Sequence, residues 1–360
     1  MSTAPGSPLL RMTQTTPTVL WNDSADPREL NEAIGWGAVG ATCNPVIALT
    51  ALKADQSTWA ARIAEYAAAH PAATDDEIGW AMVKRLSVEA AALLMPAFER
   101  YAGLNGRLSI QTDPRLYRDT ERLVEQAVEF STLAPNMIVK IPVTSAGAAA
   151  FEEATYRGVS INATVSFTVA QAVAVAEAVE RGLRRREAEG LDVSTMGPVC
   201  TIMVGRTDDW MRVSAEKEQI TVDPGITEWA GVAVFKNAYR IYRERGYRTR
   251  LLSAAFRNHM HWSQFIGGNV VISPPFGWQK RINASAIEPS HRLDDPVDPR
   301  ILEDLYDNFG EFRKAYDEDG LSIADFTSYG ATARTLRQFL QANNDLESFV
   351  RDVTLPNPDK

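Results

Sequence analysis

The chain is poor in several features that would indicate particular classes of protein. It has no apolar run of the roughly 18 to 20 residues that a membrane-spanning helix needs, and its first 18 residues lack the basic start and apolar stretch of a signal peptide. We therefore expect a cytoplasmic protein with no membrane partner. There are only two cysteines, Cys43 and Cys200, and both lie in or beside apolar runs. This placement favours buried thiols over a disulfide or a zinc site.

An excess of positive charge is also lacking. The formal net charge of the 360 residues is -9, which argues against a nucleic-acid partner, although a local basic pocket for a phosphate is compatible with it. Hydrophobic residues make up 45% of the chain, enough to bury a large core in one barrel or in two medium domains.

What the sequence does contain is a repeated alternation of short β-branched runs and stretches of helical character. This alternation is typical of βα units around a parallel sheet, and eight such runs favour a closed barrel. We find no internal repeat or linker. The sequence thus predicts an α/β protein, a single (β/α)8 TIM barrel over residues 1–360 with its core at about 15–345. The runs are residues 18–21, 39–43, 108–112, 137–141, 160–167, 199–204, 250–256 and 269–273.

Extra helices are predicted at two places. About 60 residues separate the second run from the third, and they include amphipathic stretches at 52–69 and 78–102. The tail at 322–353 is also helical in pattern, and it is preceded by a polar stretch at 288–300 that predicts a surface loop.

The fourth run places Lys140 among apolar residues. Burial disfavours the ammonium form of a lysine, and the neutral amine is the form that attacks a carbonyl to make a Schiff base. A lysine that reaches water at the strand end, or that pairs with a buried acid, is the structural alternative.

Polar residues follow or line several other strands. Asp23 ends the first run and would bring a carboxylate to the face where barrel enzymes place their sites, unless it or Asp26 caps the next helix. Asn44 follows the second run, and with Pro45 it is also typical of a turn. In the fifth run the period of two places three polar residues on one face, which lines either the lumen or a site: Asn162, Thr164 and Ser166.

Two arginines follow the sixth and seventh runs, Arg206 and Arg257. Guanidinium groups bind phosphate with two hydrogen bonds, and barrels often hold phosphate near their later strands. Surface ion pairs are the alternative for each arginine taken singly. The pair His259 and His261 has no acidic or cysteine neighbour in the sequence, so a place at a helix start is favoured over a metal site.

Taken in order, these motifs resemble those of the transaldolase family over roughly residues 15 to 345. They are the aspartate of the first strand, T-x-N-P, D-x-R-L-x-x-D-T-E at 113–121, I-V-K-I-P-x-T, G-x-x-I-N-x-T-x-x-F, V-G-R-x-x-D-W and F-R-N. The resemblance implies a (β/α)8 barrel and class I chemistry without metal or cofactor. It also implies sugar-phosphate substrates and a place in carbohydrate metabolism such as the pentose phosphate pathway. A homo-oligomer is compatible with the sequence.

The resemblance also implies roles for individual residues. Lys140 matches the lysine that forms the imine with the ketose, Asp23 matches the carboxylate that accepts a proton beside the breaking bond, and Thr164 matches the residue that positions a water. The remaining matches surround the three-carbon unit or bind the phosphate: Asn44, Asn162 and Thr201 for the former, Arg206 and Arg257 for the latter.

The departures from the family pattern affect the reaction more than the fold. Gln111 occupies the position of a glutamate in typical transaldolases, and an amide orients water but cannot transfer a proton. The fructose-6-phosphate aldolase branch resembles this chain in having glutamine there, yet it has a tyrosine where this chain has Met203. Ala255 replaces a serine of some relatives.

We therefore expect an enzyme that transfers a dihydroxyacetone unit from a ketose phosphate to an aldose acceptor, with Lys140, Asp23, Gln111 and Thr164 as its catalytic residues. A fructose-6-phosphate-type aldolase that releases dihydroxyacetone is the alternative. A sugar-phosphate-binding homologue with reduced catalysis is a weaker third hypothesis.

Overall fold

Eight parallel strands close into a barrel in the computed structural model, which describes residues 6–359. Each strand pairs with its neighbours in sequence order, and the last pairs with the first. The predicted (β/α)8 barrel is confirmed, and every strand lies within one of the eight predicted runs or one residue beyond it. The strands are β1 (Val19–Asn22), β2 (Ala38–Thr42), β3 (Arg107–Gln111), β4 (Met137–Pro142), β5 (Ile161–Ser166), β6 (Val199–Ile202), β7 (Arg250–Ala254) and β8 (Val271–Ser273).

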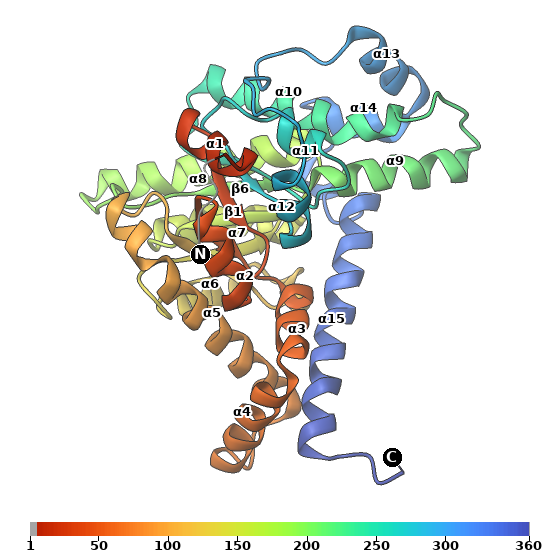
Figure 1. Cartoon of the computed structure of the whole chain (residues 1–360). Helices are drawn as coiled ribbons and strands as arrows, with labels where there is room; N and C mark the ends of the chain where they lie inside the picture. Colours follow the sequence, from red (N-terminus) through yellow and green to blue (C-terminus); the bar gives the residue numbers. More distant parts are fainter. Residues whose placement is uncertain (1–5, 360) are drawn as a thin grey trace.

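Helices follow the strands and cover the outside of the barrel (Figure 1). Most begin with a side chain that caps the first free backbone N–H groups, as Thr168 does for α8 and Thr144 for α7. The helices around the barrel are α1 (Pro8–Thr15), α2 (Pro27–Gly35), α6 (Thr120–Ser131), α7 (Ser145–Tyr156), α8 (Val169–Ala188), α9 (Val204–Glu218), α10 (Ala230–Arg245), α11 (Met260–Ser263) and α12 (Phe276–Asn283).

The predicted extra helices are present. Between β2 and β3 lie α3 (Pro45–Ala54), α4 (Gln56–Ala69) and α5 (Asp75–Arg100), and the tail forms α15 (Gly330–Thr354). Helix α15 packs along all three, and together they project from the barrel as one group (Figure 1). The C-terminal helix is thereby fixed beside the β2–β3 connection.

The segment before α15 is only partly a loop. Residues 288–298 lack regular structure, as expected, but the chain then forms α13 (Pro299–Asn308) and α14 (Gly310–Tyr316). Asp298 caps α13 by accepting a hydrogen bond from the Arg300 N–H, so the aspartate and proline that suggested a loop instead start a helix.

The barrel lumen has an apolar layer that contains Trp21 of β1. Its other members come from β4, β6, β7 and β8: Ile138, Val199, Leu252, Ala254 and Val271. Gly40 on β2 makes room for the indole, because a Cβ there would lie 2.5 Å from the Trp21 ring. On β4 and β6 the polar residues Lys140 and Thr201 follow Ile138 and Val199 of this layer by two residues, toward the carboxyl ends of the strands.

No helix among residues 6–359 is both long and apolar enough to cross a membrane. The two cysteines are free thiols and buried, as predicted.

The lumen layer gives a first prediction. Trp21→Ala should lower the free energy of unfolding by about 3–5 kcal/mol, because it empties a fully buried indole site that the surrounding strands cannot close. Urea denaturation followed by circular dichroism measures the loss. Trp36→Ala is the matched control, since Trp36 is only partly buried and stacks on Phe276. Equal losses in both variants would contradict a rigid lumen layer.

Candidate active site

Lys140 lies in the middle of the barrel wall on β4 and is only 3% exposed. Its register neighbours are Gln111 on β3 and Asn162 on β5, so these three side chains belong to one level of the barrel. The alternative in which the lysine reaches out into water is therefore excluded. Among the described residues no ion pair within 4 Å neutralises it.

The electrostatics around Lys140 favour the neutral amine. Burial lowers the pKa of Lys140, and the nearby charge of Arg206 lowers it further, while Asp23 opposes both by favouring the ammonium form. The net direction is downward. A lysine in this environment has a larger fraction of nucleophilic amine at neutral pH than an exposed one.

Asp23 is free to act on Lys140 because another residue caps the next helix. Asp26 accepts the hydrogen bonds of the Arg28 and Glu29 N–H groups at the start of α2. Asp23 instead accepts a hydrogen bond from the Thr42 hydroxyl of β2. Burial raises the pKa of Asp23, and Lys140 and Thr42 counteract this rise. A carboxyl with a raised pKa takes up and releases protons more readily near neutrality.

A chain of hydrogen bonds crosses the lumen at the level of Lys140. The Asn162 amide donates to the Ser109 hydroxyl at 3.0 Å, and the Thr201 hydroxyl donates to the other end of the amide at 2.8 Å. The predicted polar positions Asn162 and Thr201 are thus in direct contact. Ser109 was not predicted, although the period of two on β3 places it on the same face as Gln111.

Other polar atoms of this region have no partner among the described residues. They are the Gln111 carbonyl oxygen and the hydroxyls of Thr164 and Ser166, all buried. Leaving such atoms unpaired costs about 1–3 kcal/mol each. They are therefore the groups at which a hydroxylated ligand or a water finds hydrogen bonds.

Asn44 caps a helix and also lies beside the site. Its side-chain oxygen accepts the Ile47 N–H at 3.0 Å and caps α3, which is the turn-like role that the sequence also allowed. A small cavity next to it has room for about one water. This cavity is also lined by Gln111 and by Asn343 of α15, so the C-terminal helix closes one side of the site.

Arg206 lies in the first turn of α9, because β6 ends at Ile202 and Met203 and Val204 leave the predicted strand for the helix. Its guanidinium donates to the hydroxyl of Thr335 at 3.2 Å and to Gln338, both on α15. Burial and the charge of Arg257 lower the pKa of Arg206 to about 10. The two predicted arginines are therefore close enough to repel each other.

Arg257 follows β7 on a loop and is exposed. It makes a two-pronged ion pair with Asp209 of α9, with Nη2 and Nε 2.8 and 3.0 Å from Oδ2. The surface ion pair that the sequence offered as the alternative is thus present. This ion pair also keeps the Arg257 guanidinium against α9, the helix that carries Arg206.

Comparison with known proteins identifies the family of the chain. Residues 20–321 match the family model described as Transaldolase/Fructose-6-phosphate aldolase. The chain belongs to this family. The resemblance inferred from the ordered motifs is confirmed.

Curated relatives with the name "Transaldolase" are similar over part of the chain. The protein from Thiobacillus denitrificans is 39% identical over 160 residues, 43% of this chain and 44% of the relative. Those from Mycolicibacterium smegmatis and Mycobacterium tuberculosis are each 33% identical over 57% of this chain and 55% of the relative. The matched part thus spans about half the length of these relatives.

Within the family fold, sequence reasoning missed one buried pair. His261 of α11 and Asp208 of α9 are both fully buried, with Nε2 and Oδ2 2.9 Å apart. The helix start expected around His259 and His261 is present as α11, and the acidic partner was missed because it lies 53 residues earlier in the chain. Between residues 6 and 359 no three His, Cys, Asp or Glu side chains gather as a metal-binding group.

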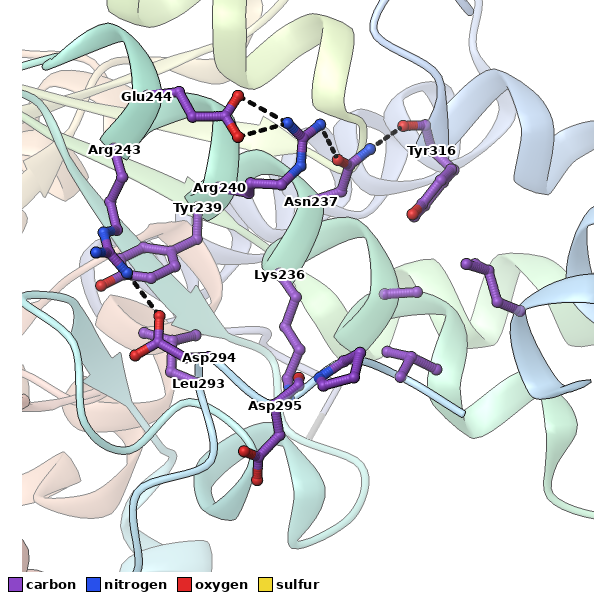
Figure 2. A pocket seen from close by; sticks show the side chains of 14 residues that line it. Lys236, Asn237, Tyr239, Arg240, Arg243, Glu244, Leu293, Asp294, Asp295 and Tyr316 are labelled. Atoms are coloured by element: carbon purple, nitrogen blue, oxygen red, sulfur yellow. Dashed lines mark hydrogen bonds and ion pairs between the residues drawn. The ribbon is translucent and has the colours of Figure 1, made fainter. Parts of the chain in front are cut away.

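A second lysine with a lowered pKa has a structural role. Lys236 of α10 lines a cavity of about 570 Å³ between α10 and residues 293–302 (Figure 2). Burial lowers its pKa to about 8. Its amine donates to the oxygens of Gln264, Arg292 and Asp295 at 2.7–2.9 Å. All three of its donors are used to hold a loop, so Lys236 is not available as a nucleophile.

Two ionisable groups at the centre of the transaldolase-family barrel predict a stability cost. The double variant Lys140→Met/Asp23→Asn should unfold at a higher temperature than the natural chain, with a gain of about 1–4 kcal/mol, because burial disfavours the charged forms of both groups and the replacements are neutral and of similar size. Differential scanning calorimetry at pH 7 measures it. The two single variants are the controls, and a less stable double variant would show that the pair stabilises the fold.

Proposed function

We propose that this chain is a class I transaldolase that moves a dihydroxyacetone unit from a ketose phosphate to an aldose acceptor. The observation that carries the proposal is the buried, unpaired Lys140 with its lowered pKa, at the level of the polar chain in the barrel lumen. Membership of the Transaldolase/Fructose-6-phosphate aldolase family supports it.

In this mechanism the neutral amine of Lys140 attacks the ketose carbonyl, and loss of water gives a protonated imine. Asp23 accepts the proton of the hydroxyl next to the bond that breaks, and the electron pair of that bond moves to the imine. An aldose phosphate leaves, and the lysine retains dihydroxyacetone as an enamine. The enamine carbon attacks an acceptor aldehyde, Asp23 returns the proton, and water releases the new ketose.

The remaining polar residues have roles that fit their positions. Asn162 and Thr201 bind the hydroxyls of the three-carbon unit next to their own hydrogen bond, while Asn44 contributes its free amide N–H groups. Gln111 and Thr164, with their unpaired oxygens, orient the water that hydrolyses the imine. Arg206 and Arg257 bind the phosphate, a dianion that compensates their mutual repulsion.

An aldolase is the second candidate because of the amide at Gln111. Its buried, unpaired oxygen lies beside Lys140 in the register, where it holds a water that protonates the enamine. In that case free dihydroxyacetone leaves and no acceptor sugar is needed. Met203 has no hydroxyl to assist this step, and so the transferase is favoured. A sugar-phosphate-binding homologue is the third candidate, and the same experiment tests it.

Trapping with borohydride tests the proposal. The protein is incubated with fructose 6-phosphate and borohydride, and digestion followed by mass spectrometry should find the reduced adduct on Lys140. Lys140→Met should abolish it. Lys236→Arg is the matched control, because it removes the other low-pKa amine but retains donors for its three oxygens. An adduct on Lys236, or none with any ketose phosphate, would contradict the mechanism.

The acceptor decides between the two enzymes. With erythrose 4-phosphate present, the transferase should form sedoheptulose 7-phosphate and should leave less trapped adduct. Free dihydroxyacetone at the same rate with and without the acceptor would instead establish the aldolase. Adduct formation without turnover of either kind would support the binding homologue.

A further inference from the structure

The two arginines of the proposed phosphate site are held near each other by different elements. Arg206 is on α9, and Arg257 is on the loop after β7. Burial lowers the pKa of Arg206 to about 10, and the nearby positive charge of Arg257 adds to this lowering. Contacts that join α9 to the loop keep the arginines together in the absence of an anion, and the ion pair between Arg257 and Asp209 of α9 is one of them.

The buried pair Asp208 and His261 is such a contact. Asp208 lies on α9 two residues after Arg206, and His261 lies on α11, four residues after Arg257. The Arg257 backbone N–H donates to His261 Nδ1 at 3.0 Å, so this nitrogen is the acceptor. The proton of a neutral imidazole is then on Nε2, which donates to Asp208 Oδ2 at 2.9 Å. The histidine thus links the backbone of one arginine to the helix of the other.

The link extends to a third element. The second oxygen of Asp208 accepts the Gly231 N–H at the start of α10 at 2.8 Å. Burial raises the pKa of Asp208, while His261 and the Gly231 N–H oppose this rise. Both carboxylate oxygens and both ring nitrogens are therefore used, and neither side chain can rotate without leaving a buried polar atom unpaired.

The loop also approaches α9 unusually closely. A Cβ at Gly205 would lie 1.9 Å from the Ala255 carbonyl oxygen and 2.8 Å from Cγ of Arg257. Ala255 itself has a φ of 63°, in the left-handed region that is unfavourable for a residue with a Cβ. Such a backbone persists only where neighbouring contacts hold it, and the His261 bond to Arg257 lies two residues further on.

We propose that Asp208 and His261 are positioning residues of the anion site: they fix the backbone of Arg257 against α9, so that Arg206 and Arg257 receive a phosphate monoester together. This inference rests on the proposed function for the identity of the anion. It adds two residues, Asp208 and His261, that contact no substrate atom. They fix the distance between the two guanidinium groups that bind the phosphate.

Two substitutions of His261 separate its two bonds. His261→Asn retains a side-chain oxygen that accepts the Arg257 N–H but loses the bond to Asp208. His261→Gln reaches Asp208 but leaves the Arg257 N–H unpaired. His259→Gln is the matched control, because His259 is on the same short segment and its side chain bonds to the Ser263 hydroxyl rather than to Asp208 or Arg257. Circular dichroism at 20 °C checks that each variant is folded.

Binding of inorganic phosphate, measured by isothermal titration calorimetry, is the first readout. We expect the Kd to rise about tenfold in His261→Gln, less in His261→Asn, and not in His259→Gln, since the loss of one ordering contact is worth about 1.4 kcal/mol. Equal effects of the two His261 variants, or none, would overturn the positioning role. Arg257→Gln gives the size of the effect when the arginine itself is lost.

Borohydride trapping with unphosphorylated dihydroxyacetone is the second readout, since it needs Lys140 but no phosphate site. The inference predicts that trapping is unchanged in every His261 variant, while the KM for fructose 6-phosphate rises and kcat is retained. A parallel loss of trapping would mean that the pair supports the whole barrel, which contradicts the inference. Failure of the natural chain to trap either sugar would contradict only the proposed function, because phosphate binding tests the pair independently.

Discussion

The structure depends on keeping one lysine amine inside the barrel wall without a close counter-charge. Lys140 is 3% exposed, and burial lowers its pKa. The lumen makes this possible because it has two levels, an apolar layer around Trp21 and a polar level formed by Ser109, Asn162 and Thr201. The first is apolar, and the second places neutral hydrogen-bonding groups at the level of the lysine. A desolvated amine beside neutral polar groups remains uncharged more easily than one beside a full ion pair.

Different secondary-structure elements carry the acidic and the basic groups around Lys140. Asp26 caps α2, so Asp23 is left to face Lys140. The arginines lie on α9 and on the loop after β7, and contacts from elsewhere hold them: α15 bonds to Arg206, while Asp209 pairs with Arg257. The C-terminal helix therefore contributes to the site although it lies outside the eightfold repeat. The same helix also packs on α3, α4 and α5 of the insertion after β2.

The sequence predicts much of this because the signals are local. Each strand run has its own β-branched pattern, and the period of two on β5 predicts a polar face that includes Asn162, whose amide bonds to Ser109 and Thr201 in the structure. What it missed depends on contacts between distant positions. The His261 partner is 53 residues away, and the packing of α15 on Arg206 spans 129 residues. Proline and aspartate at the start of α13 suggested a loop, because both residues serve turns and helix starts alike.

The account rests on the neutral amine of Lys140, and its protonation can be measured directly. In protein labelled with 15N-lysine, the Nζ resonance of Lys140, assigned with Lys140→Met, is followed by NMR as the pH is raised. The account predicts a titration midpoint below the ordinary value of 10.5, because burial outweighs the opposing charge of Asp23. It also predicts a further fall in Asp23→Asn, which removes that charge. A midpoint at or above 10.5 would mean that an ammonium occupies the barrel, and it would contradict the mechanism.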